Sequence, residues 1–356
     1  MNNNSFSCSA RETFFIVLIL TTNKIITNSP LLLVRNSGTG APLSALLSGL
    51  LAIALIYFLT ARFHRKRNRN ILFTAETLWG KAVNCLLSLI LVAYLFASSL
   101  YLLTEVTNFS KLIAFPTTPF WFVAVFFVVA AAAGAANGGK GLCRTAVFIA
   151  GFFLASLLVV CLSPLFQSDF TNLAPVLGTS AENTLFKGLG GISQYRDIVL
   201  LLLLEPDFSS QKSARRTVTA AASVGALFNF LLIFAYTAKV PYPISAEEQF
   251  PAYLLLKEVS FGRFFQRLDA IFLLASALCG MFSLALNIKL ISAIFRRTFG
   301  IKPTGIALSA TAITLFSSAI MSLSPSPAAI SAVGLAILGI FALWALFIRK
   351  ERSDTL

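Results

Sequence analysis

The chain has 356 residues, of which 57% are hydrophobic and only 12% are charged, with a net charge of +14 and a mean hydropathy of +0.83. A water-soluble domain carries about twice that share of charged residues, so the chain has too little polar material to cover a soluble surface. A bilayer needs no such cover, and only helices or closed barrels satisfy the backbone there. The apolar runs are about 20 residues long and lack the alternation of strands. We therefore predict an all-α integral membrane protein.

In chain order, ten apolar runs are predicted to cross the membrane. They cover about Thr13–Asn36, Pro42–Ala61, Val83–Thr104, Pro119–Ala136, Leu142–Ser163, Asn183–Glu205, Val218–Ala238, Leu268–Ile294, Gly305–Leu323 and Ala328–Ile348. No linker or low-complexity segment divides them, so residues 1–356 are expected to form a single transmembrane domain. A short helix lying on the membrane surface is expected over Glu247–Lys257.

Basic residues predict the orientation of these spans. With the N-terminus inside, the inner segments hold 18 Lys and Arg residues and the outer segments hold 7. Cytoplasmic segments are usually enriched in Lys and Arg, so both termini are expected in the cytoplasm. The basic run His64–Arg69 is explained by anchoring against anionic membrane lipid, and no nucleic-acid partner is expected.

Cysteine and histidine usage argues against a metal site and against catalysis. The five cysteines are scattered over different spans and segments without a CxxC pair or metal-ligand spacing, and His64 is the only histidine. We expect no metal, no cofactor and no enzymatic activity.

Two of the predicted spans are interrupted by polar residues near their midpoints. The first contains Thr21–Lys24 and then Pro30, which removes a helix donor. The sixth contains the run Gly190–Asp197, which opens with two glycines that weaken a helix. Polar groups inside a membrane are costly and usually functional. An alternative for each break is packing or hydrogen bonding against a neighbouring helix.

The two interrupted spans lie five spans apart, as expected for two inverted repeats of five helices. The repeats would cover about residues 11–163 and 182–348. The ends of the half-helices expose N–H and C=O groups at the bilayer midplane, where a small zwitterion could be held. Ten residues are the candidate ligand-binding set: Thr22, Asn23, Lys24, Tyr94, Ser98, Gly190, Gly191, Ser193, Gln194 and Ser283.

Several alternatives remain open within this set. An unpaired ammonium at the depth of Lys24 is unfavourable, so we expect a carboxylate partner, with Asp197, Glu205 and Asp269 as the candidates. The Lys24 ammonium could instead occupy a monovalent-cation site. Aromatic packing is an alternative role for Tyr94 and its neighbour Ser98. Helix packing is the alternative for the small residues of the eighth span, which are Ser276, Cys279, Gly280 and Ser283.

Short motifs, in a consistent order, give the chain a family resemblance. The motifs are Glu76–Lys81 before the third span, Phe115–Pro119 before the fourth, Asp169–Gly178 after the fifth, Leu204–Pro206 ending the sixth and Arg267–Asp269 opening the eighth. In order and spacing they resemble the spore germination permease family, the B subunits of GerA-type germinant receptors within the amino acid–polyamine–organocation group. The resemblance covers about residues 11–350. Two departures are the charged Asn23–Lys24 segment, where the family has a glycine-rich break, and Gln266 in place of a glutamate.

The resemblance implies a LeuT-like fold with discontinuous first and sixth helices, in the inner membrane of an endospore or a cell membrane. It further implies a receptor that binds a small germinant, often an amino acid, and acts with A and C subunits. In that setting Lys24 would mimic the ammonium of a ligand or a coupling cation. A secondary amino-acid transporter of the same group and a ligand-free membrane scaffold are the other candidate functions.

Overall fold

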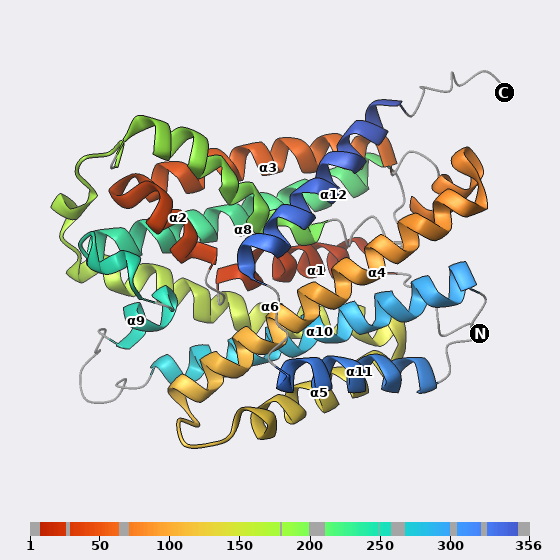
Figure 1. Ribbon diagram of the computed structural model, residues 1–356. Coiled ribbons are helices and arrows are strands. Elements are labelled where there is room, and N and C mark those ends of the chain that lie inside the picture. The colour runs from red at the N-terminus through yellow and green to blue at the C-terminus, as the bar shows by residue number, and fades with distance from the viewer. Residues whose placement is uncertain are drawn as a thin grey trace.

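The computed structural model describes residues 8–25, 29–63, 71–178, 180–198, 211–248, 250–257, 268–299, 305–321 and 326–347. Throughout these ranges the regular structure is helical, as the composition predicts. Long helices lie roughly side by side in one bundle (Figure 1). The predicted segments Leu204–Pro206 and His64–Arg69, together with Arg267, lie outside the described residues.

The described helices overlap the predicted spans, although the helix at the third span, Ile71–Ile113, extends well beyond the predicted Val83–Thr104. The α-helices are α1 (Ala10–Thr22), α2 (Ser29–Ser37), α3 (Ala41–Phe63), α4 (Ile71–Ile113), α5 (Phe120–Ala136), α6 (Gly138–Leu162), α8 (Gln211–Lys239), α9 (Pro251–Lys257), α10 (Leu268–Phe299), α11 (Gly305–Ile320) and α12 (Pro327–Phe347). The short helix predicted over Glu247–Lys257 is α9. The predicted sixth span is the π-turn η5 (Asn183–Lys187) followed by the 3₁₀ segment η6 (Gly188–Ile198).

Five helical segments in the described ranges are long and apolar enough to cross a bilayer. They are Pro30–Ala61, Gly80–Ile113, Gly138–Phe166, Ser213–Lys239 and Asp269–Arg296, and two apolar helices, Phe120–Ala136 and Ala328–Ala342, are shorter. These segments make the chain a multi-pass membrane protein. The count of ten spans stays a prediction.

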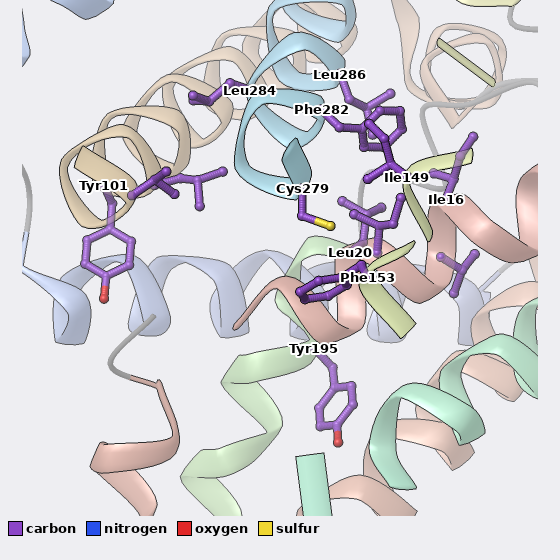
Figure 2. Packing of buried hydrophobic residues seen from close by; sticks show 14 of the residues in the cluster. Ile16, Leu20, Tyr101, Ile149, Phe153, Tyr195, Cys279, Phe282, Leu284 and Leu286 are labelled. Atoms are coloured by element: carbon purple, nitrogen blue, oxygen red, sulfur yellow. The ribbon is translucent and has the colours of Figure 1, made fainter. Parts of the chain in front are cut away.

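The two interrupted spans lie inside the bundle. Helix α1 packs against α6 and α8, and η6 packs against α3 and α12. Buried apolar side chains from α1, α6 and α10 meet there, and Figure 2 shows Cys279 and Phe282 gathered with Leu20 and Phe153. A disulfide joins Cys8 to Cys143, which ties the segment before α1 to the start of α6. The breaks therefore lie in the protein interior, where polar groups must find protein partners.

The motif-bearing segment 169–178 is a loop fitted against α2 and α8. Asn172 Nδ2 donates to the Ala238 carbonyl at 3.1 Å, and Thr39 Oγ1 donates to the Pro175 carbonyl at 2.7 Å. Gly178 has φ +64, and a Cβ there would lie 1.9 Å from the Ser37 carbonyl oxygen. Only glycine fits this close approach in a left-handed conformation.

Candidate functional site

The first break begins where α1 stops after Thr22. The hydroxyls of Thr21 and Thr22 donate to carbonyls one turn earlier in α1. The next residues, Asn23–Ile25, form a 3₁₀ turn, and α2 starts at Ser29 with Pro30 in its first turn. Proline suits a helix start because its missing N–H would lack a partner there anyway. The predicted interruption of the first span is thus present in the described residues.

The second break replaces α-helix by a π-turn and then 3₁₀ geometry over Asn183–Ile198. Such turns often mark functional positions within helices. The two glycines at this break differ. Gly191 is buried, and a Cβ there would lie 2.7 Å from Ser48 Oγ, whereas a Cβ on exposed Gly190 would meet no described atom within 4 Å. Close helix packing therefore explains Gly191 but not Gly190.

An ion pair joins the two breaks. Lys24 Nζ lies 2.6 Å from Asp197 Oδ2, and the side chains are 4% and 11% exposed. The other carboxylate oxygen, Asp197 Oδ1, accepts a hydrogen bond from Tyr94 Oη of α4 at 3.1 Å. Of the three predicted partners of Lys24, the structure selects Asp197. Glu205 lies outside the described residues, and Asp269 lies in the first turn of α10.

Arg196 is the second cation at this position. Its Nε lies 4.0 Å from Asp197 Oδ1, and its Nη1 donates to the Ser193 carbonyl and to Ser331 Oγ of α12. Arg196 is 2% exposed, and its Nε meets no hydrogen-bond acceptor in the part of the chain that the structure describes. A buried guanidinium with one unused donor is suited to a carboxylate.

Two amide contacts fix the breaks to neighbouring helices. Asn23 Nδ2 donates to Ser283 Oγ of α10 at 3.1 Å, and Asn229 Nδ2 of α8 donates to Gln194 Oε1. Hydrogen bonds of this kind hold discontinuous helices in register, because an unpaired polar group in hydrocarbon costs several kcal/mol.

The predicted residues therefore differ in what they contact. Lys24 and Tyr94 share a carboxylate, while Asn23, Ser283 and Gln194 form the amide contacts. Ser98 is buried one turn beyond Tyr94 on α4, and Ser193 supplies a carbonyl to the arginine. Thr22 bonds its own helix, and Gly190 and Gly191 shape the backbone.

Sequence reasoning missed Asn229, Ser331 and Gly334 and assigned no role to Arg196. A Cβ on Gly334 of α12 would lie 2.6 Å from Arg196 Cδ, so this glycine makes room for the arginine. An amide inside an apolar span was the available signal for Asn229. Ser331 and Gly334 are ordinary residues of an apolar helix, and only the packing of α12 against η6 reveals them.

Comparisons with known proteins place this chain in a family. Residues 8–326 match a family model described as spore germination protein. The chain is 20% identical over 284 residues to spore germination protein KB of Bacillus subtilis (strain 168), covering 78% of this chain and 75% of the relative.

Solved transporter structures share the fold. MhsT in complex with L-phenylalanine matches with a TM-score of 0.69 at 15% identity, covering 96% of this chain and 88% of MhsT. A Na⁺-coupled sialic acid symporter matches with a TM-score of 0.70 at 14% identity, covering 94% and 78% of the two chains. Mhp1, a nucleobase-cation-symport-1 family transporter, matches with a TM-score of 0.64 at 14% identity, covering 98% and 82%. The predicted all-α, LeuT-like fold is confirmed.

Proposed function

The chain belongs to the spore germination protein family, and from that premise we propose that it is the B subunit of a germinant receptor. It binds a small nutrient, an amino acid being the favoured class, at the two helix breaks. Binding there triggers germination through A and C subunits in the spore inner membrane, with both termini of this chain in the cytoplasm. The single domain is built from two inverted repeats, over about residues 11–163 and 182–348.

The observation that carries this proposal is the buried ion pair between the breaks. Burying two charges costs several kcal/mol per ion, and a well-packed apolar pair is often as stable. Such a pair inside a membrane therefore indicates a functional position. The Lys24 ammonium is already paired with Asp197. The Arg196 Nε, which has no acceptor among the described residues, therefore supports recognition of a carboxylate on the ligand.

A germination experiment tests the proposal. The double variant Lys24→Met/Asp197→Asn and the single variant Lys289→Met are expressed in a strain lacking the natural gene. Lys289 is the matched control because it is a buried lysine of α10. Spores are then exposed to amino acids, sugars and nucleosides, and germination is followed by the fall in optical density.

We expect the double variant to reach the membrane at the normal level and to lose its nutrient response, while Lys289→Met keeps it. A double variant with a normal dose response would contradict the site. Co-purification of tagged protein with A and C subunits tests the partners separately.

A secondary amino-acid transporter is the second candidate, favoured by the transporter fold. Uptake of a labelled amino acid by proteoliposomes distinguishes the two. A receptor binds its ligand without concentrating it. A secondary transporter accumulates the ligand inside the vesicle, driven by the movement of an ion down its gradient.

A further inference from the structure

Away from the breaks, an apolar groove opens between α4, α5 and α10. Its volume is about 580 Å³, and its walls are almost entirely aromatic and aliphatic, including Phe122, Phe126, Phe127, Leu273 and Met281. Phe122 and Phe126 are about half exposed, so the groove opens sideways from the bundle towards the bilayer. Lipid chains are the solvent on that side.

The length of the groove matches one leaflet. Its lining on α10 runs from Ala270 to Met281, which corresponds to about 16 Å of helix. Half of the hydrocarbon core is about 15 Å thick. The groove thus extends from the membrane interface, where α4 ends and α5 begins, to a depth close to the midplane.

The interfacial end of the groove is polar, unlike the rest. Ser110 and Thr118 line it there. Lys111 lies one helical turn before the lining residue Ala114, is partly exposed, and forms no ion pair with another described residue. A lysine at the bilayer surface attracts anionic headgroups. An apolar slot one leaflet deep, with a lysine one helical turn from its interfacial end, has the charge and shape to hold an anionic phospholipid.

We propose that this groove binds one anionic phospholipid, with an acyl chain along α10 and the phosphate beside Lys111. The bound chain lies against α10, the helix whose Ser283 holds Asn23 at the first break.

The test measures lipid retained by the purified protein. The chain and its variants are reconstituted in vesicles of equal phosphatidylglycerol and phosphatidylcholine, extracted in detergent, and weighed by native mass spectrometry. Ala277 lines the groove, and Ala277→Phe fills it. Ala133→Phe is the matched control, since Ala133 is exposed on α5 and does not line the groove. Leu274→Trp narrows the groove from its open side and serves if Ala277→Phe does not fold.

We expect the unaltered protein and Ala133→Phe to retain one phosphatidylglycerol, and the filled variants to retain at least about tenfold less, because the aromatic ring occupies the space of the acyl chain. Lys111→Gln should lower the preference for phosphatidylglycerol about fivefold, the ratio that one surface lysine supplies. Equal retention of both lipids, or retention by the filled variants at the normal level, would overturn the proposal. So would a filled variant that keeps its lipid but loses a bound polypeptide.

Discussion

Removing either partner of the Lys24–Asp197 ion pair should have unequal consequences. At 2.6 Å, the attraction between the two charges is on the order of 6 kcal/mol at an effective dielectric constant of 20. Asp197→Asn removes the carboxylate that pairs with Lys24 and lies beside Arg196. Breaking a buried ion pair from one side costs about 3–5 kcal/mol.

Lys24→Met should destabilise the protein less than Asp197→Asn does. Asp197 keeps the hydroxyl of Tyr94 at 3.1 Å and Arg196 Nε at 4.0 Å, so the main loss is one hydrogen bond to a charged group, about 1.5–3 kcal/mol. The double variant removes the pair together, and its cost should be smaller than the sum of the single variants by about 0.5–3 kcal/mol.

The midpoint of thermal unfolding, measured in one detergent, compares the unaltered protein, the two single variants and the double variant. The expected order of destabilisation is Asp197→Asn first, then Lys24→Met. If Lys24→Met proved as damaging as Asp197→Asn, or if the single effects simply added, the carboxylate would not be the shared centre of this cluster.

The remaining predictions compare neighbouring positions. Gly191→Ala forces a Cβ to 2.7 Å from Ser48 Oγ and should cost about 1–3 kcal/mol, whereas Gly190→Ala should change the midpoint of thermal unfolding little. Gly334→Ala places a Cβ 2.6 Å from Arg196 Cδ, which should displace the arginine side chain and weaken the nutrient response. Gly339→Ala on the same helix, where a Cβ meets no described atom within 4 Å, should leave the dose response unchanged. Tyr94→Phe removes one hydrogen bond to a charged group and should cost about 1.5–3 kcal/mol, measured in the same unfolding assay; a stability equal to that of the unaltered chain would refute the bond.

Composition and periodicity alone determined the membrane class and the approximate position of most helices. Apolar runs of bilayer length have no other stable conformation in lipid, so helices such as α5 and α10 begin within a residue or two of their predicted starts. The interruptions at Asn23–Lys24 and Gly190–Gly191 were also visible, since polar residues and paired glycines inside an apolar run violate that rule.

Tertiary packing alone decided how those interruptions are satisfied. Lys24 and Asp197 are 173 positions apart in the sequence, and three carboxylates were equally plausible partners until the packing of α1, α4 and η6 brought one of them to 2.6 Å. The same holds for Gly334, whose role exists only because α12 packs against the side chain of Arg196. Local patterns report the cost of a buried charge, but its partner is set by which helices pack together, and that depends on side-chain fit over the whole bundle.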